Sequence, residues 1–297
     1  MEKLCSLCGT SANPTLVNRR DYDYGVPYTL EYWACSGCGL VFADPIPVSL
    51  IPDFYRCYST HLLEDGHDGN GIFWRIVEAL APSVDRNGAF EKFDIAKDAR
   101  VLDFGCGSGR FIVQLMSSSY CNVAGCDFDP KVAAISIPGL RFFQGIDSLV
   151  NERFDVITLN YVIEHLPDPV GTLRQLVGHL AEGGFIYIRT PNVMSSLARR
   201  FGDHWRGWDT PRHLHLFTLA ALRLAAGAAA LGLRELVTSN DMRAGMFTGS
   251  VANLVSSRLV RRAIIAFSYV PTAWALHHTL SQNWQSGEEI VALMEPQ

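Results

Sequence analysis

A glycine-rich turn between a strand and a helix limits the fold of this chain more than any other feature. The sequence RVLDFGCGSGRFIVQL starts at Arg100 as an apolar strand, turns through Gly105, Cys106, Gly107 and Gly109, and continues with apolar residues at helical spacing. Glycines there let the backbone approach an adenosyl ligand, and the next helix points its N-terminal amides at the same place. The passage predicts an α/β fold with a cofactor at the carboxyl end of the strand.

An acidic residue follows the next predicted strand. Residues 122–126 are apolar enough for a buried strand, and Asp127 comes directly after them. An acid at this place can accept hydrogen bonds from both hydroxyls of a ribose, as it does for NAD, so NAD competes with an adenosyl cofactor. The glycine loop separates the two, because Gly107 and Gly109 lack the Gly-x-Gly-x-x-Gly spacing of a pyrophosphate loop. The spacing therefore favours a cofactor without a pyrophosphate.

Four motifs occur in order over about residues 98–192: VLDFGCGSG, GCDFDP, FDVITLNYVIEHLPDP and LAEGGFIYIRTPN. Together they resemble the class I S-adenosylmethionine (SAM)-dependent methyltransferases, whose fold is a seven-stranded Rossmann-like α/β sheet. The resemblance implies SAM as the cofactor. It also implies a set of residues that contact SAM or its adenine: Asp103, Gly105, Cys106, Gly107, Asp127, Phe128, Asp147 and Asn160.

The predicted methyltransferase domain spans residues 72–297. Apolar residues at helical spacing indicate helices over 72–80 and 89–93, and Thr218 is placed to cap a later helix. The last three strands are predicted at 180–190, 233–238 and 289–294. The final two strands should form an antiparallel hairpin, as the family sheet does.

A helical insertion of about residues 239–287 separates the two strands of that hairpin. Its apolar segment carries a cluster of arginines on one side. Such a segment packs on the domain, packs on a second subunit, or lies on a membrane surface as a peripheral contact. The sequence favours packing, because the apolar run is short. It does not specify an oligomeric state.

Two similar cysteine turns lie near the N-terminus, each with the pattern Cys-x-x-Cys-Gly. Four thiolates in a tetrahedron suit Zn²⁺ and leave no coordination position open for a substrate. A structural Zn²⁺ in a zinc ribbon over residues 1–42 is therefore predicted, and the proline-rich stretch 43–71 is interpreted as a linker or substrate lid. The predicted ligands are Cys5, Cys8, Cys35 and Cys38.

Charge and hydropathy exclude several classes of protein. A net charge of −5 and a pI near 6.0 give no field that would gather a nucleic-acid backbone, so nucleic acid is not expected as a partner. The first residues lack the apolar core of a signal peptide, and no run of about 18 apolar residues is free of charge. A cytoplasmic protein with reduced cysteines is expected.

The loop over residues 203–218 suggests the methyl acceptor. It holds two tryptophans, whose faces stack on sugars, and two arginines, which pair with phosphate. Its pattern Thr210-x-Arg-His213-Leu-x-x-Phe217 is similar to the Tyr-x-Glu-His-Leu-x-x-Phe of sugar C-methyltransferases, which also join a four-cysteine zinc module to this fold. The resemblance implies that His213 is the catalytic base. Because the Tyr and Glu positions differ here, transfer to an oxygen of a glycan, glycolipid or sugar nucleotide stays open beside C-methylation.

His165, in the Glu-His-Leu motif after the fourth strand, is the second candidate base, with a structural role in its loop as the alternative. The sequence thus predicts a methyltransferase of polysaccharide or secondary-metabolite biosynthesis. Two other functions remain. A methyltransferase of ribosomal RNA or another macromolecule would call for a basic ribbon, which this chain lacks. A non-catalytic protein that binds a partner through its ribbon would not need the intact glycine loop or Asp127.

Overall fold

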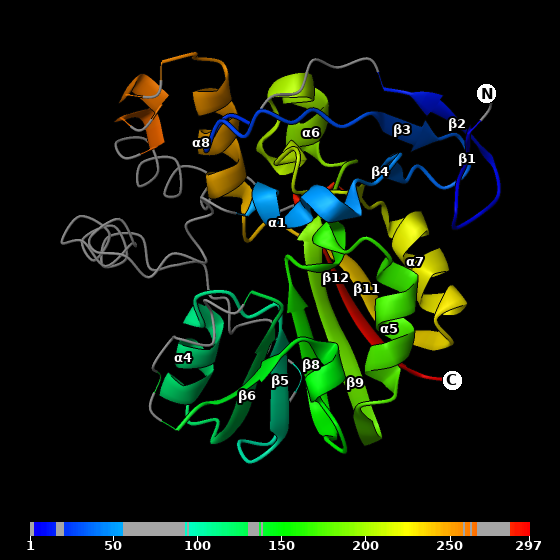
Figure 1. The fold of residues 1–297 in the computed structure, drawn as a ribbon, viewed down its shortest axis with the longest axis vertical. Coiled ribbons are helices and arrows are strands. Elements are labelled where there is room, and N and C mark those ends of the chain that lie inside the picture. Colours follow the sequence, from blue (N-terminus) through cyan, green and yellow to red (C-terminus); the bar gives the residue numbers. More distant parts are fainter. Residues whose placement is uncertain are drawn as a thin grey trace.

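The described residues of the chain form two β-sheets, one of seven strands and one of five (Figure 1). A computed structural model describes residues 3–15, 21–55, 93, 95–129, 137, 139–257, 259–261, 263–265 and 286–297. Among these residues, no helix combines the length and the apolar character needed to cross a membrane.

The large sheet has the strand order β11-β12-β9-β8-β5-β6-β7. Its parallel strands are β5 (Arg100–Phe104), β6 (Asn122–Asp127), β7 (Arg141–Gln144), β8 (Phe154–Asn160) and β9 (Leu180–Pro191). The antiparallel hairpin is β11 (Leu231–Ser239) with β12 (Glu289–Pro296). The order and the hairpin confirm the predicted seven-stranded Rossmann-like sheet, and the strands predicted at 180–190, 233–238 and 289–294 all lie within observed strands.

Helices cover both faces of this sheet (Figure 1). α4 (Arg110–Ser117) packs in an apolar cluster with Val101 of β5, whereas α5 (Pro169–Val177) and α7 (Leu219–Ala228) pack in a cluster with Leu102. Consecutive strand residues point to opposite faces, so α4 lies on one face and α5 and α7 on the other. The central strands are apolar along their length because both of their faces are buried. As predicted, Thr218 caps α7, its hydroxyl accepting the Ala221 N–H (3.0 Å).

The small sheet joins the N-terminal strands to the C-terminal domain. Its strands are β1 (Lys3–Leu4), β2 (Ser11–Pro14), β3 (Tyr32–Cys35), β4 (Val41–Ala43) and β10 (His215–Leu216). β10 pairs with β4 and sets His215 opposite Phe42. Buried residues of the cysteine-rich module, such as Cys38 and Leu40, belong to the same apolar cluster as α7. The predicted module over residues 1–42 is thus built into the rest of the fold.

The remaining described elements are short, apart from α8. They are η1 (Val48–Leu50), α1 (Ile51–Phe54), η4 (Ile146–Ser148), η5 (Ile163–His165), α6 (Ser196–Phe201), η6 (Gly202–His204), η7 (Arg206–Trp208) and α8 (Arg243–Asn253). The predicted linker or lid over 43–71 contains η1 and α1 in its described part, and α8 begins the predicted insertion. The helices predicted at 72–80 and 89–93 lie outside the described residues, Phe93 excepted, as do residues 56–71 and 266–285.

Candidate functional site

The carboxyl ends of β5 and β8 meet at the predicted cofactor edge. Asp103, near the end of β5, accepts a hydrogen bond from the Thr158 hydroxyl (2.7 Å) and one from the Asn160 side-chain amide (3.4 Å). Burial raises the pKa of Asp103 to about 7, and the nearby charge of Asp127 adds to the increase. These bonds brace the two strand ends and hold the Asn160 amide between them.

Asp127 holds the glycine turn. It ends β6, is buried, and accepts hydrogen bonds from the backbone N–H groups of Gly107 (2.9 Å) and Asp129 (3.0 Å). Gly105 has a φ of 74°, and a Cβ there would lie 2.5 Å from Val162, so this position requires glycine. A carboxylate at the predicted ribose position, beside a glycine-rich turn, fits an adenosyl ligand.

Phe128 and Asp147 lie at the same edge. Phe128 follows Asp127, is 54% exposed, and sets its ring edge-on to Tyr55 with 5.5 Å between centroids. Asp147 lies in η4, and this turn is tied to β6 through a hydrogen bond from the Gly145 N–H to the Asp127 carbonyl (2.8 Å). The structure thus gathers both residues next to the predicted ribose site.

Cys106 contributes only its backbone to the glycine turn at the predicted cofactor site. A Cβ on Gly125 of β6 would lie 2.9 Å from the Cys106 sulfur, so the thiol packs against the backbone of that strand. Burial raises the pKa of this thiol, and the charges of Asp103 and Asp127 raise it further. The thiol is a neutral part of the core, and only the Cys106 peptide belongs to the turn.

The two histidines predicted as bases lie against each other. His165 ends η5, which follows β8, and His213 precedes β10; their rings are edge to face with centroids 4.6 Å apart. Nδ1 of His165 lies 2.9 Å from the Tyr55 hydroxyl and 3.1 Å from the Arg212 carbonyl. Nδ1 of His213 lies 2.8 Å from the Gly207 carbonyl. The sequence placed these histidines in separate loops, and the fold brings them together.

A buried carboxyl group faces the histidine pair. Oε2 of Glu164 accepts a hydrogen bond from the Thr190 hydroxyl (2.9 Å), while Oε1 has no hydrogen-bond partner among the described residues and lies 3.9 Å from Nε2 of His213. Burial raises the pKa of Glu164 to about 8 and lowers that of His213 to about 4. Burial, followed by repulsion from His213, lowers the pKa of His165 to about 3. At neutral pH, burial therefore favours the neutral form of all three side chains.

Arg212 is held by carboxylates on two sides. Its guanidinium pairs with Asp21 (2.9 and 3.1 Å) and with Asp209 (2.8 and 3.1 Å), and all three side chains are buried. Burial alone would raise the pKa of both carboxyl groups. Arg212 nevertheless lowers the pKa of Asp21, and with Arg206 it holds that of Asp209 well below its usual range. Because Asp21 comes from the N-terminal segment, these ion pairs fasten that segment to the loop that carries His213.

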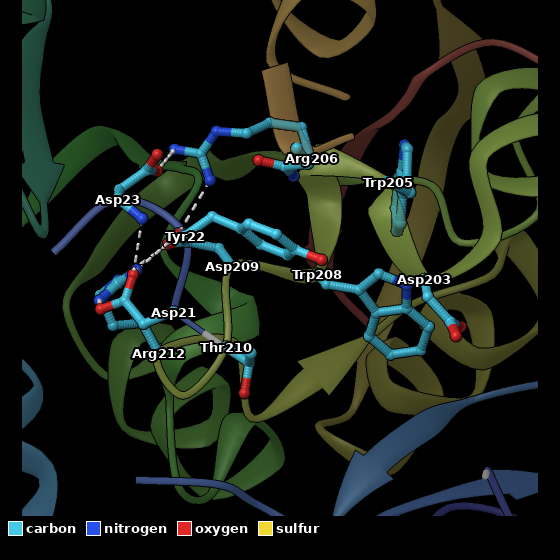
Figure 2. A pocket seen from close by; sticks show the side chains of 11 residues that line it. Asp21, Tyr22, Asp23, Asp203, Trp205, Arg206, Trp208, Asp209, Thr210 and Arg212 are labelled. Atoms are coloured by element: carbon cyan, nitrogen blue, oxygen red, sulfur yellow. Dashed lines mark hydrogen bonds and ion pairs between the residues drawn. The ribbon is translucent and has the colours of Figure 1, made fainter. Parts of the chain in front are cut away.

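Figure 2 shows the pocket where residues 21–23 meet the loop 203–212. Arg206 crosses this pocket and pairs with Asp23 (2.9 Å) and Asp209 (2.9 Å). Trp205 is 1% exposed and lies in the core. Of the two tryptophans and two arginines expected to face a sugar or phosphate, Trp205 is therefore unsuited because its ring is buried, and Arg212 because two carboxylates already neutralise its guanidinium.

The sulfur atoms of the two cysteine turns converge. All four lie within 4.8 Å of one another. Both turns have the same backbone geometry, in which the N–H of Gly9 or Gly39 donates to the carbonyl of the first cysteine in its turn and each glycine has a positive φ. Four sulfurs around one point match the tetrahedral thiolate site that Zn²⁺ favours. The residues are those predicted: Cys5, Cys8, Cys35 and Cys38.

Three residues of this site were missed by the sequence prediction. Glu164 stands next to His165 in the Glu-His-Leu motif, and that adjacency was a signal for it. Tyr55 and Asp21 carry no local signal, since they contact His165 and Arg212 from distant parts of the chain.

Comparisons with known proteins identify the family of the chain. A protein-family model described as a methyltransferase domain matches residues 73–236, more than half of the chain. The trans-aconitate 2-methyltransferase of Deinococcus radiodurans is 34% identical over 98 residues, which are 31% of this chain and 38% of that protein. An O-methyltransferase of ubiquinone biosynthesis from Nitrosospira multiformis is 30% identical over 105 residues, 31% of this chain and 43% of that protein. The chain spans less than half the length of these curated relatives.

A solved structure gives a similar fold at low sequence identity. One chain from the complex between the Haloferax volcanii methyltransferase activator Trm112 and a methyltransferase has a TM-score of 0.51 at 16% identity, covering 75% of this chain and 93% of that one. At this level of identity the likeness concerns the fold alone.

Proposed function

The chain belongs to the family of SAM-dependent methyltransferase domains, and we propose that it transfers the methyl group of SAM to an oxygen or a carbon of a saccharide-containing or related small molecule. The observation that carries the proposal is a row of four rings that starts at the cofactor edge. Phe128 and Tyr55 are 5.5 Å apart between centroids, Tyr55 and His165 5.9 Å, and His165 and His213 4.6 Å. The row connects the predicted adenosyl site to the pair of candidate bases.

His213 is the proposed proton acceptor. SAM, when bound, supplies an electrophilic methyl group whose transfer leaves the bonding electron pair on sulfur. The carbonyl of Gly207 can only accept a hydrogen bond, so the ring proton of His213 stays on Nδ1 and Nε2 keeps its lone pair. Burial keeps the imidazole neutral at pH 7, which is the form that accepts a proton. Asp209, with Oδ2 at 3.9 Å from Nε2, offsets the positive charge that then forms.

The acceptor class rests on the sequence pattern around His213, because Trp205 and Arg212 are buried and do not face an acceptor. The pattern from Thr210 to Phe217 is similar to that of sugar C-methyltransferases. The names of the curated relatives point to small acceptors, trans-aconitate in one case and an O-methylated compound of ubiquinone biosynthesis in the other. We therefore propose a sugar hydroxyl or an acidic sugar carbon in polysaccharide or secondary-metabolite biosynthesis.

The four-cysteine cluster is proposed to hold a structural Zn²⁺. Four sulfur ligands leave no open coordination position, so the metal would stabilise the module without touching the substrate. The Thr218 hydroxyl donates to the Cys38 carbonyl (2.6 Å) and at the same time caps α7. A filled cluster would thereby brace the segment that directly follows His213.

Methyl transfer from radiolabelled SAM tests the proposal. Purified protein is incubated with sugar nucleotides, lipid-linked glycans and RNA in parallel, and SAM binding is measured separately by calorimetry. We expect label on a sugar-containing acceptor. Label on RNA alone would overturn the acceptor class, whereas the absence of any heat of SAM binding would overturn the activity itself. Asp127→Ala is the control variant, in which SAM binding should be weaker because the carboxylate of the predicted ribose site is absent.

A further inference from the structure

Glu164, His165 and His213 form a second group of potential metal ligands. One ligand atom from each side chain lies within 4.8 Å of those of the other two. Glu164 is fully buried and His213 is 7% exposed, whereas His165 is half-buried and leaves one side of the group open. The three side chains come from two segments, η5 and the loop before β10, which the fold sets side by side.

The free oxygen of Glu164 needs an explanation. Thr190 satisfies Oε2, but Oε1 faces His213 at 3.9 Å, beyond hydrogen-bond length, and has no partner among the described residues. Buried carboxyl oxygens in folded proteins are almost always bonded, and an exception points to a strained group, a water molecule or an ion at that place. Two imidazole rings beside the free oxygen make an ion the most economical partner.

The hydrogen bonds of both histidines leave Nε2 available. Nδ1 of His213 faces the Gly207 carbonyl, and Nδ1 of His165 faces the Arg212 carbonyl as well as the Tyr55 hydroxyl. A carbonyl only accepts, so in each ring the proton belongs on Nδ1 and the lone pair on Nε2. Metal-binding histidines in proteins are held in the same way, with the second ring nitrogen donating to a backbone carbonyl or a carboxylate.

Asp209 lies just outside this group. Its Oδ2 is 3.9 Å from Nε2 of His213, but its two oxygens already accept hydrogen bonds from Arg206 and Arg212. It is therefore better placed to add negative charge near a cation than to bind one directly.

We propose that Glu164, His165 and His213 bind one divalent transition-metal ion. Two imidazole nitrogens and one carboxylate oxygen suit Zn²⁺, Co²⁺ or Fe²⁺ better than Mg²⁺ or Ca²⁺, which prefer oxygen ligands. Three protein ligands leave a position open, in contrast to the four-sulfur cluster. The site is thus separate from the cysteine module in both place and chemistry.

The consequence for the reaction rests on the proposed function. A hydroxyl group of the acceptor that occupies the open position loses its proton to solvent more easily, because the metal stabilises the resulting alkoxide. His213 then acts as a ligand of the metal that activates the acceptor, and in the metal-free protein it is the direct proton acceptor. The ion undergoes no redox change.

Metal binding on the full chain tests this site. Protein as purified is dialysed against Co²⁺, and bound cobalt is measured by elemental analysis and by visible absorption. With Zn²⁺ retained in the cysteine cluster, we expect one Co²⁺ per chain without a thiolate-to-metal charge-transfer band, because no cysteine is a ligand of this second site. Glu164→Gln and His213→Ala should each weaken this binding by at least about 10-fold, the loss that even an outer-shell partner of a metal causes.

His179→Gln is the matched control. His179 precedes β9 at the opposite end of the sheet, where Nδ1 lies 3.3 Å from the Glu152 carbonyl, so its replacement should leave Co²⁺ binding unchanged. SAM binding retained by Glu164→Gln shows that this variant is folded. If the wild-type chain takes up cobalt only at thiolates, or if both ligand variants bind Co²⁺ as the wild type does, the site is refuted.

Methyl transfer separates this inference from the proposed function. Suppose that the ligand variants lose cobalt binding while the wild-type chain transfers methyl groups to none of the acceptors. This result supports the metal site and refutes the proposed function. A chelator can remove the metal that is not bound by thiolates. If methyl transfer is then undiminished, the metal has no role in the reaction, and His213 is supported as the direct base.

Discussion

The ion pair between Asp21 and Arg212 joins two distant segments, and Asp21→Asn measures its contribution to stability. Asn keeps the shape of the side chain and an oxygen for the backbone N–H groups of residues 23 and 24, but it removes the charge and the second oxygen, which accepts the Val26 N–H (3.1 Å). Breaking a buried ion pair from one side costs about 3–5 kcal/mol of unfolding free energy. Arg212 keeps Asp209 as a partner, which places the expected loss at about 3 kcal/mol.

Urea denaturation followed by circular dichroism measures this loss. At a slope near 3 kcal/mol per molar urea, the midpoint should fall by about 1 M. Glu152→Gln is the control, since the pair Arg141–Glu152 is half-exposed (58% and 30%) and exposed pairs contribute at most about 1 kcal/mol. An Asp21→Asn midpoint no lower than that of the control would refute the reasoning.

The same pair predicts a pH dependence. The pKa of Asp21 is lower in the folded chain than in the unfolded one, so its contribution is fully present above the unfolded value of about 3.9. It is lost as the pH falls through the lower, folded value. The stability difference between wild type and Asp21→Asn should thus be constant from pH 7 to about pH 5 and shrink below about pH 4. A difference that widens in acid would contradict this sign.

Three further predictions concern the site itself. His213→Ala should lower turnover by about 10²- to 10⁴-fold with nearly unchanged SAM affinity in calorimetry, and unaltered turnover would remove His213 from the reaction. Asp127→Ala should weaken SAM binding by roughly 10- to 150-fold, because hydrogen bonds to a charged group are worth about 1.5–3 kcal/mol, and calorimetry against wild type decides this. Removal of the thiolate-bound metal with a strong chelator should release one Zn²⁺ from the cysteine cluster and lower the thermal midpoint, as expected when the metal binds only the folded module; a midpoint that does not move would show that the cluster needs no metal.

Local sequence signals were sufficient to predict the cofactor edge. The turn around Gly105 and the acid at the end of β6 are set by residues a few positions apart, and their roles follow from backbone geometry and strand direction. The seven-stranded sheet followed from the resemblance carried by the four motifs, which occur along the chain as they do in the family. Thr218 was recognised as a cap for the same reason, because capping involves only the next turn of helix.

Contacts between side chains far apart in the sequence could not be predicted from these local signals. Arg212 in a polar loop looks like a phosphate ligand, and only the fold reveals that Asp21 and Asp209 neutralise it. Trp205, in the same loop, looks like a ring on which a sugar could stack. It instead packs in the core with residues of α8 and the small sheet. The meeting of Glu164 with His213 depends on how two loops pack, so neither the group nor its free oxygen could be inferred from spacing.

The pairing of β4 with β10 has a consequence for the order of events during synthesis. The N-terminal strands leave the ribosome first, yet the edge of β4 stays open until residues 215 and 216 have been made and can reach it. Contacts so far apart in sequence form late and slowly. During translation the exposed edge is a template for pairing with other chains, and a metal on the cysteines would be what keeps that nascent segment compact until its last strand arrives.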